Sequence, residues 1–451
     1  AAGYVRKYFE ERGQIKRRSE VERIARGCTG VLRSTGQHPG GIVVLPLGED
    51  INSFTPVQHP ANDMTSNIVT THFDYHKIDH NLLKLDILGH LDPTMIRMLQ
   101  DLTGVDPVTI PLDDKKVMSL FQDLSALGIS PDDIDGCTIG ARGIPEFGTD
   151  NAINMLKDTK PKSFTDLVRI SGLSHGEGIW EGNAKDLILS GTTTISEAIC
   201  TRDDIMIYLI HMGLESSEAF DIMENVRKGK VAKGKCDKWP QWKQDMADHN
   251  VPQWYIESCE KIQYMFPKAH AAAYVMMAWR VGYCKVYYPL AYYTAYFTIR
   301  AKAFNYEIMC QGQARALKEL DDLKKKKKDQ KKNKEEASAK DDDTISDLLL
   351  VQEMYARGLE FTPIDIYRAH SRNFQIIDGK IMPALSSIEG MGATAAEQFM
   401  EGARGEKFLS LDDLRARTKA PAKVVEKMKQ LGLLEGLPES NQLSLFDLMS
   451  S

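Results

Sequence analysis

The stretch NLLKLDILGH, residues 81–90, decides the fold class because it introduces a strand pattern into a chain that is mostly helical in its periodicity. Its apolar side chains, from Leu83 to Ile87, alternate with polar ones, which is typical of a half-buried β-strand. This alternation places Asp86 on the opposite face, beside Lys84. The carboxylate has two interpretations: part of a solvated strand face with a lysine neighbour, or a ligand for a metal ion.

Short apolar segments upstream of this stretch support a small sheet. The glycine-rich GQHPGG leads into an apolar strand from Ile42 to Leu45, and NIVTTHFDYHKI alternates in a strand-like way. Residues 1 to about 33 have helical spacing instead, with Gly27 following as a stop signal. We therefore predict helices first and then a small sheet.

Helical periodicity dominates from about residue 91 to 300 and predicts a large helical domain. Connecting helices are expected over residues 301–375. Within them, residues 318–343 carry ten lysines and nine acidic side chains with almost no apolar residues. Such a segment cannot bury a core, so we expect a solvated helix or a disordered insert. The neighbouring acids argue against reading its lysine run as a DNA-binding patch.

The carboxy-terminal part reads as small helical units and a tail. NFQIIDGKIMPAL is hairpin-like, with Asp378 and Gly379 as a plausible tight turn. In IEGMGATAAEQFME, Gly390 and Gly392 precede a helix start, which favours a helix-hairpin-helix module or, alternatively, a plain helix cap. The tail QLSLF has the pattern of a peptide that docks in a groove of a partner or folds back on its own domain, through Gln442, Leu443, Leu445 and Phe446.

Composition narrows the function classes. A net charge of −6 with 57 lysines and arginines among 451 residues argues against a uniformly basic surface but permits local basic patches. Seven scattered cysteines indicate neither a disulfide framework nor a CxxC zinc site. The most apolar segment is interrupted by Arg280, Lys285 and Pro289, so no membrane span is expected. Because the chain starts in a helical pattern without an initiator Met, we expect the carboxy-terminal part of a longer protein.

Two segments have the residue types for phosphoryl transfer. Asp86 suits a site in which carboxylates on adjacent strands hold two Mg²⁺ ions, although the strand-borne DxD that would complete it is missing from this sequence. In MFPKAHAAAYVMMAWR, Lys268 and His270 open an alanine-rich helix whose free amides favour a polyanion, and Tyr264 and Phe266 could stack on a base. An ordinary alanine-rich core helix is the alternative. Further cations could meet phosphates or form a solvated face, namely Arg202, Arg227, Lys228 and Lys230.

Several long motifs together resemble one family. They are STGQHPGGIVVLP, TTHFDYHKIDHNLLKLDILGHLDPTMIRMLQDLTG, GIPEFGTDNA, ISGLSHGEGIW, TRDDIMIYL, VRKGK and MFPKAHAAAYVMMAWR. This set is similar to the PolC-type α subunit of bacterial DNA polymerase III, the C-family replicase of low-GC Gram-positive bacteria. The likeness runs from residue 1 to about 312 and from about 344 to the end, so only the charged insert departs from it.

The resemblance implies a predominantly helical α+β multidomain chain with a polymerase-β-like palm sheet. Its implied domains are part of a thumb (1–33), part of the palm (34–100), fingers (101–300), a tandem helix-hairpin-helix duplex-binding domain (376–438) and a tail that binds the sliding clamp (439–451). Asp86 then matches the third metal-binding aspartate, with Lys84, His38 and Gly40 as palm neighbours. The DxD aspartates, the proofreading exonuclease and the zinc-binding cysteines of the family would all lie upstream of residue 1.

The resemblance also implies binding roles. Residues on motifs that line the nucleotide pocket are Arg202, Tyr264, Phe266, Lys268, His270, Ser171 and His175, with Tyr264 stacking on the base and Arg202 meeting phosphates. DNA contacts are expected from Gly390, Gly392, Arg227, Lys228 and Lys230. Gln442 to Phe446 match the motif that docks on the sliding clamp.

The implied activity is template-directed transfer of deoxynucleotides to a primer 3′ end, with two Mg²⁺ ions and no organic cofactor. The expected partners are primer-template DNA, the incoming dNTP, the β sliding clamp, the clamp loader and other replisome subunits, in the cytoplasm and away from membranes. Two alternatives are a non-catalytic, clamp-tethered DNA-binding processivity module and a metal-dependent nuclease that uses Asp86. Because its metal site is incomplete, this chain alone is expected to be inactive.

Overall fold

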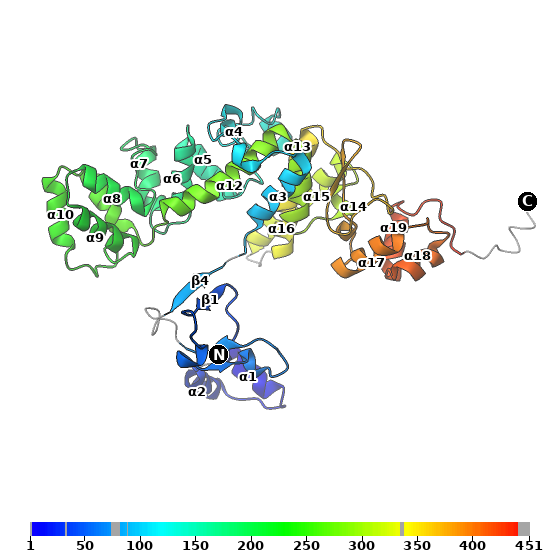
Figure 1. The fold of residues 1–451 in the computed structure, drawn as a ribbon, viewed down its shortest axis with the longest axis horizontal. Coiled ribbons are helices and arrows are strands. Elements are labelled where there is room, and N and C mark those ends of the chain that lie inside the picture. Colours follow the sequence, from blue (N-terminus) through cyan, green and yellow to red (C-terminus); the bar gives the residue numbers. More distant parts are fainter. Residues whose placement is uncertain (1, 32–33, 74–81, 88, 334–337, 441–451) are drawn as a thin grey trace, which may run out of the picture. The chain divides into compact units, whose positions relative to one another are not determined.

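The protein is described by a computed structural model that covers residues 2–31, 34–73, 82–87, 89–333 and 338–440 (Figure 1). By their internal contacts the residues form two compact units, Ala1–His90 and Leu91–Ser451. Helices make up most of the ordered elements, and the described part of the chain contains three sheets of two strands each. The predicted α+β class with predominant helices is confirmed.

Two helices open the first unit, α1 (Ala2–Glu10) and α2 (Arg18–Cys28). They pack against each other through a small core of Val5, Val21 and Ala25. The helical spacing of the sequence therefore predicted this segment correctly.

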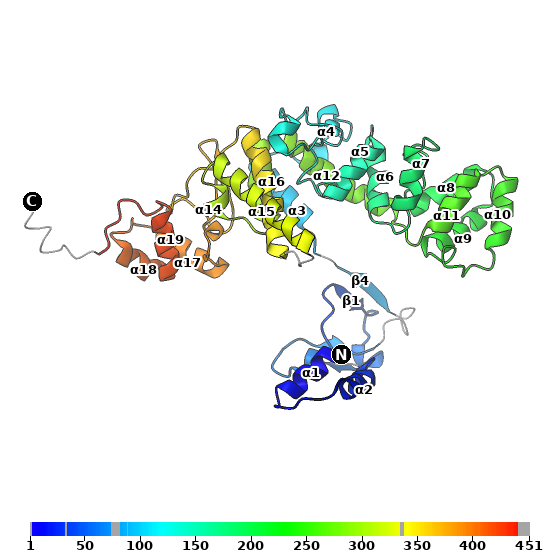
Figure 2. The ribbon, with the colours of Figure 1, turned by 180° about the vertical axis from the view of Figure 1, so that it is seen from behind.

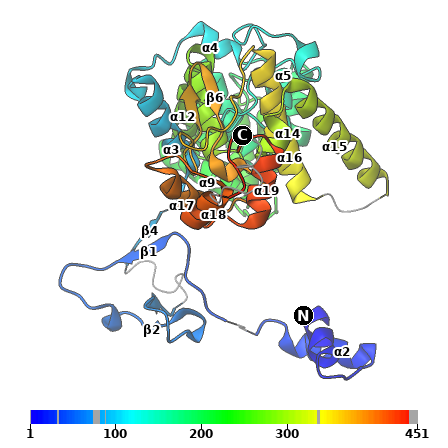
Figure 3. The same cartoon turned by 90° about the vertical axis from the view of Figure 1, so that its right-hand side faces the viewer.

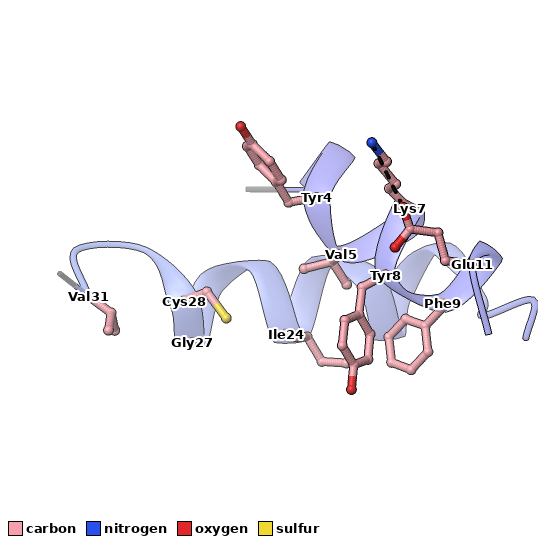
Figure 4. A pocket seen from close by; sticks show the side chains of 10 residues that line it. All are labelled: Tyr4, Val5, Lys7, Tyr8, Phe9, Glu11, Ile24, Gly27, Cys28 and Val31. Atoms are coloured by element: carbon pink, nitrogen blue, oxygen red, sulfur yellow. Dashed lines mark ion pairs between the residues drawn. The ribbon is translucent and has the colours of Figure 1, made fainter. Parts of the chain in front are cut away.

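An apolar groove lies beside the contact of these two helices (Figure 4). Tyr4 and Phe9 come from α1, whereas Cys28 and Val31 come from the end of α2 and the residues after it. The cavity has a volume of about 780 Å³. The aromatic rings of α1 thus remain accessible along one side of the helix pair.

One sheet of the first unit contains Leu83–Asp86 of the stretch NLLKLDILGH. Strand β1 (Gly41–Val44) pairs antiparallel with β4 (Leu83–Asp86), in a register that sets Gly41 opposite Asp86. A second pair of strands and two short 3₁₀ turns complete the unit: β2 (Val57–Gln58), β3 (Thr70–Thr71), η1 (Ile51–Ser53) and η2 (Pro60–Asn62). Both predicted strands around Asp86 are therefore present.

The burial expected for the apolar face of this sheet is wrong. Leu83, Leu85 and Ile87 are 61%, 42% and 57% exposed, and Ile42 and Val44 on β1 are exposed as well. A two-stranded sheet buries a face only when another layer covers it. The described residues of the first unit supply no such layer, so the alternation gives the strand but not the burial.

The second unit is helical from its first residue. Its elements are α3 (Leu91–Thr103), η4 (Pro107–Thr109), α4 (Lys115–Ser119), η5 (Pro131–Ile134), α5 (Asp150–Thr159), α6 (Phe164–Ser174), the irregular turn η6 (Trp180–Ala184), α7 (Lys185–Leu189), α8 (Arg202–His211), α9 (Ser216–Arg227), α10 (Trp239–Asp248), α11 (Gln253–Lys261), α12 (Lys268–Tyr287), α13 (Pro289–Ile299), α14 (Tyr306–Met309), α15 (Gln313–Asn333), α16 (Ala339–Ala356), β5 (Gln375–Ile377), β6 (Lys380–Met382), η7 (Leu385–Ser387), α17 (Ala393–Ala403), α18 (Leu411–Thr418) and α19 (Ala422–Gln430). Pro289 separates α12 from α13, as the sequence predicted.

The boundary between the units lies at His90 and Leu91. The resemblance implied an end of the palm at residue 100, which falls inside α3, whereas the helical periodicity predicted from about residue 91 agrees with the start of this helix. Met95 and Leu99 of this helix are buried in a core that also includes side chains of α13 and α16. Since α3 packs with the helices that follow it, the segment from residue 91 onward belongs to the helical unit.

Helix α12 is the central element of the second unit (Figure 1). It contacts α3, α4, α6, α8 and α13. Its small residues Ala271, Ala278 and Gly282 are buried, which lets neighbouring helices approach closely. The alternative reading of an alanine-rich core helix is therefore correct for this face of α12.

A buried ion pair joins α12 to α16. Lys285 and Glu353 are 0% and 1% exposed, and the Lys285 Nζ lies 2.8 Å from a Glu353 carboxylate oxygen. Lys285 also donates to the backbone carbonyls of Gly140 and Arg142, while Glu353 accepts a hydrogen bond from the Tyr293 hydroxyl at 2.6 Å. Burial lowers the pKa of Lys285 to about 8. These bonds thus link α12, α13, α16 and the loop at residues 140–142.

The charged segment forms most of a helical hairpin, α15 and α16 (Figure 3). Lys326 and Lys327 on α15 each lie 2.6 Å from an acid on α16, Asp341 and Asp342 respectively. Lys324 pairs with Asp135. Of the two expectations for this segment, the helix is correct for the residues that the structure describes.

The carboxy-terminal part contains the predicted hairpin. Strands β5 and β6 pair antiparallel, and both turn residues have positive φ angles, +50° at Asp378 and +77° at Gly379. This is the backbone of a type I′ turn, which Asp-Gly sequences favour. Helices α17, α18 and α19 follow (Figure 2). They share one core, to which they contribute Phe399, Leu414 and Val425 respectively.

Within the described residues, none of the helices has both the length and the apolar character needed to cross a bilayer.

The carboxylate of Asp347 in α16 gives a prediction on stability. Its Oδ2 accepts the backbone N–H groups of Lys302 and Ala303, yet burial raises its pKa to about 6. The native state therefore holds a proton that the unfolded chain has lost between about pH 4 and 6, so this group lowers stability as the pH rises through that range. Asp347→Asn keeps the acceptor oxygen, and we expect it to stabilise the chain by about 2 kcal/mol at pH 7.

Urea unfolding at pH 4, 5, 6 and 7 measures this effect. Asp237→Asn is the control, because Asp237 is an exposed acid of the same unit. An Asp347→Asn variant whose stability relative to the parent is the same at every pH would contradict the prediction.

Candidate active site

The first unit places the predicted palm residues around one turn and one strand. The backbone N–H groups of Gly40 and Gly41 donate to His38 Nδ1 at 3.2 and 2.6 Å. Asp86 is 61% exposed and its carboxylate lies 3.0 Å from Lys84 Nζ. A cavity of about 540 Å³ has His38 and Lys84 in its lining.

Gly41, the residue opposite Asp86, leaves room for the His38 ring. Gly41 carries no side chain, and a Cβ there would lie 2.8 Å from His38 Nδ1. This close approach therefore requires glycine at this position. The Asp86 carboxylate itself is exposed to solvent.

Asp86 by itself fits one ligand position of a metal site. No three His, Cys, Asp or Glu side chains converge anywhere in the part of the chain that the structure describes. An exposed carboxylate on a strand is a suitable hard ligand for a divalent cation. The remaining ligands would have to come from residues outside the described ones.

The second unit brings four separate motifs together. The loop after α6 bonds to the segment before α12, since Glu177 N–H donates to the Tyr264 carbonyl at 3.0 Å. The first residue of α8, Arg202, donates its backbone N–H to the carbonyl of Phe266 at 3.2 Å. Gly229, with φ +64°, sits directly against the backbone of Gln263. Segments that are distant in sequence thus form one surface.

Aromatic rings form a ladder across this surface. The His175 ring stacks on Phe266 at a centroid distance of 4.8 Å, and Phe266 meets the edge of His270 at 4.9 Å. His270 in turn lies 4.6 Å from Tyr274. Tyr264 is 45% exposed next to this ladder in sequence. Phe266 is half-buried by its two histidine neighbours and so serves as their packing partner.

The cations of this surface are paired with acids on helix α8. Lys268 Nζ lies 3.1 Å from Asp204, and the Lys268 backbone N–H donates to Asp203 at 2.8 Å. The Arg202 guanidinium is 3.9 Å from Asp203. The first amide of α12 is therefore already bonded, although the sequence predicted it as free for an anion.

The other predicted cations lie at the end of α9. Arg227 and Lys228 both pair with Glu224, at 2.5 and 2.8 Å, and these cations lower the pKa of Glu224 to about 2. Lys230 is exposed. The cluster thus keeps a net positive charge after its internal pairing.

One predicted site residue, Ser171, lies away from this surface. Ser171 is 1% exposed in α6, and its hydroxyl has no hydrogen-bond partner among the described residues. A ligand in solvent cannot reach it in this conformation. The clamp-motif residues lie outside the described residues, and they are Gln442, Leu443, Leu445 and Phe446.

The helix-hairpin-helix region has one glycine that its backbone requires. Gly390 has a φ of +85°, whereas Gly392 has a φ of −64° and is the N-cap of α17. Of the two glycines in this predicted turn, only Gly390 therefore has the left-handed backbone that other residues rarely adopt. Four exposed cations near these helices form no ion pair among the described residues, namely Arg404, Lys407, Lys419 and Lys423.

Family models match most of the chain. Residues 92–250 match the bacterial DNA polymerase III alpha subunit finger domain, and residues 2–89 match the bacterial DNA polymerase III alpha NTPase domain. Residues 358–443 match a helix-hairpin-helix motif. The first two models meet within two residues of the boundary between the structural units.

Curated relatives are similar along the whole chain. Proteins named DNA polymerase III PolC-type from Caldanaerobacter subterraneus subsp. tengcongensis and Clostridium perfringens are each 49% identical to it, over 450 and 446 residues. One from Streptococcus suis is 50% identical over 447 residues. Each alignment covers 99% of this chain. The chain belongs to the PolC-type DNA polymerase III family. It spans 30% to 31% of the length of these PolC-type relatives.

Three acids that contact the predicted nucleotide-binding residues of this PolC-type chain were not predicted from its sequence. Glu146 contacts His175, while Asp203 and Asp204 hold Lys268. A signal existed for Asp204, since Thr201 and Asp204 form the Thr-x-x-Asp capping box at the start of α8. For Glu146 the signal was weaker: its loop is bracketed by Gly143 and Gly148, which marks a tight turn but no partner.

Proposed function

We propose that this chain is part of a replicative DNA-directed DNA polymerase that transfers deoxynucleotides to a primer 3′ end. The observation that carries the proposal is identity of about 49% over 99% of the chain to proteins named DNA polymerase III PolC-type. The meeting of the finger-segment motifs on one surface supports it, because a nucleotide pocket needs such convergence.

In this proposal Asp86 is a catalytic residue that holds a divalent cation together with carboxylates from the rest of the polymerase. Mg²⁺ is the expected ion, because Asp86 offers a hard oxygen ligand. Bound Mg²⁺ ions would activate the primer hydroxyl and offset charge on the phosphates. His38 and Lys84 line a cavity of this unit, Gly40 donates its backbone N–H to His38, and Lys84 supplies a positive charge next to the carboxylate.

The finger residues bind and orient the incoming dNTP. Tyr264 is exposed beside the ladder and stacks on the base. Arg202, Lys268 and the His175 and His270 rings gather around Phe266, where they meet the triphosphate. In-line attack then depends on positioning and charge stabilisation.

The carboxy-terminal helices bind duplex DNA through its backbone. The turn at Gly390 and the first residues of α17 direct amides outward, and the four cations without acidic partners add positive charge. Arg227, Lys228 and Lys230 offer a second set of phosphate contacts. The tail docks on the β sliding clamp, and the clamp loader and other replisome subunits are further partners in the cytoplasm.

A direct prediction concerns the 451-residue chain by itself. We expect it to bind primer-template duplex but to extend no primer, because Asp86 lacks its partner ligands among the described residues. Affinity should fall steeply with salt and show no sequence preference, since the contacts are to phosphates. Fluorescence anisotropy with labelled duplex at several salt concentrations, together with primer extension in the presence of dNTPs and Mg²⁺, measures both.

The full-length polymerase is the positive control in this experiment. Extension by the full-length protein and none by the chain alone supports the proposal. Shortening of the DNA by the chain alone would instead indicate a metal-dependent nuclease. If the full-length protein binds duplex and clamp but never extends a primer, the non-catalytic processivity module is the correct function.

A further inference from the structure

Glu146 holds His175 at the edge of the aromatic ladder. The His175 Nε2 lies 2.5 Å from a carboxylate oxygen of Glu146. The acid is 14% exposed and the histidine 41% exposed, so one partner is shielded and the other faces solvent. The contact joins the GIPEFGTDNA motif to the ISGLSHGEGIW motif, which are 29 residues apart at this pair.

The backbone around Glu146 fixes the position of this carboxylate. Glu146 has a φ of +67°, a left-handed conformation that non-glycine residues rarely adopt. Its neighbours Ile144 and Phe147 are 2% and 1% exposed, and a Cβ on Gly148 would lie 2.8 Å from the Gly143 nitrogen. Buried side chains and a pinched loop thus hold the residue in a costly conformation. Such strain is typical of functional sites.

The geometry also fixes which nitrogen of the histidine is available. Nε2 faces Glu146, whereas Nδ1 has no hydrogen-bond partner among the residues that the structure describes. Stacking on Phe266 sets the plane of the ring. His175 is also the C-cap of α6, where the negative end of the helix dipole favours a cation.

Charged groups lie around this pair on several elements. Glu177 follows His175 in the loop after α6, and α12 contributes Lys268 and His270 across the Phe266 ring. The Glu146 side lines a cavity with further charged residues, namely Arg142, Asp150, Arg300, Lys327 and Asp342. The hydrogen bond to Glu146 raises the pKa of His175, against a smaller lowering by burial. The imidazole is therefore held in its charged form above its ordinary range.

We propose that Glu146 is a positioning residue that keeps His175 charged and oriented, so that Nδ1–H donates to a phosphate oxygen of the incoming nucleoside triphosphate. This rests on the function proposed above. Glu146 does not touch the nucleotide; it acts through the histidine. A charge-assisted hydrogen bond from an imidazolium to phosphate is stronger than one from a neutral ring, so the effect appears in nucleotide affinity.

The test is the pH dependence of nucleotide KM in the full-length polymerase. Glu146→Gln keeps the size and a hydrogen-bonding oxygen but removes the charge, so the pKa of His175 returns toward its ordinary value. We expect KM for dNTP to rise about tenfold over the parent at pH 8 and to match the parent near pH 6, with kcat little changed. Recovery at acid pH distinguishes lost charge from lost structure.

Two further variants complete the design. Glu181→Gln removes a 71% exposed acid from the segment after α6, where it pairs with Lys185, and should leave KM unchanged at every pH. His175→Gln should raise KM at pH 6 as well and abolish the difference between the two pH values. Binding of primer-template by each variant confirms that the protein is folded.

Each outcome decides the question. A KM for Glu146→Gln that equals the parent at pH 8, or that is raised equally at pH 6 and 8, overturns the proposal, as does a loss confined to kcat. If Glu146→Gln gives one of these results and the parent polymerase extends primers normally, the polymerase function stands and only the role of Glu146 fails. A parent that extends no primer overturns the polymerase function and this inference with it.

Discussion

Primer extension by the full-length polymerase is expected to fall about a thousandfold or more when Asp86 is replaced by alanine. The carboxylate is exposed on β4, opposite a glycine, and the described residues contain no group of three side chains that could hold a metal ion. In the proposed function its removal deletes a metal ligand, and it does not disturb a core. Primer-template affinity should therefore stay within about twofold, because duplex binding depends on phosphate contacts elsewhere.

Single-turnover extension and duplex anisotropy measure the two effects separately. Asp63→Ala is a suitable control, since Asp63 is an exposed acid of the same unit that bonds Thr65 of its own turn. Turnover by Asp86→Ala at the parent rate would remove Asp86 from the metal site. A parallel loss of duplex binding would show that the residue is structural instead.

Replacing Glu353 by leucine should destabilise the helical unit by about 3–5 kcal/mol, because it leaves the Lys285 ammonium buried without its counter-charge. The Tyr293 hydroxyl loses its acceptor in the same change. Replacing both charges, in Lys285→Met with Glu353→Leu, removes the uncompensated cation. We therefore expect the double variant to be more stable than Glu353→Leu alone.

Urea unfolding followed by tryptophan fluorescence reports this unit selectively. All five tryptophans of the chain lie after residue 90: Trp180, Trp239, Trp242, Trp254 and Trp279. Glu360→Leu is the matched control, because Glu360 pairs with Lys380 at an exposed position and should cost less than about 1 kcal/mol. An equally small cost for Glu353→Leu would mean that the buried lysine loses its proton without penalty.

Periodicity and turn chemistry predicted much of the local structure. The alternation at Leu83 to Ile87 gave a strand, Pro289 gave the break between two helices, and Asp378-Gly379 gave a hairpin turn. These features depend on neighbours in sequence. What the sequence could not give was the burial of the β1–β4 face or the extent of α3, because both depend on which layer packs against the element.

The candidate site was predicted in its motifs but not in its pairings. His175, Phe266 and His270 lie together as the shared motifs imply. The partners that set their charge were not visible, because Glu146 contacts His175 from 29 residues away and through a left-handed backbone. No spacing rule reports such a contact. Likewise, Ser171 of α6 shares a motif with His175, yet it is buried.

Helix α12 gives the helical unit a mechanical property. Lys268, its first residue, is held by Asp203 and Asp204, and Lys285, near its last, is held in the buried ion pair. About 25 Å of continuous helix separates them, so a tilt of about 5° around the Lys285 end would displace the Lys268 end by about 2 Å. Because both ends are held and residues between them pack in the core, the helix resists such a tilt and keeps the distance between its two ends fixed.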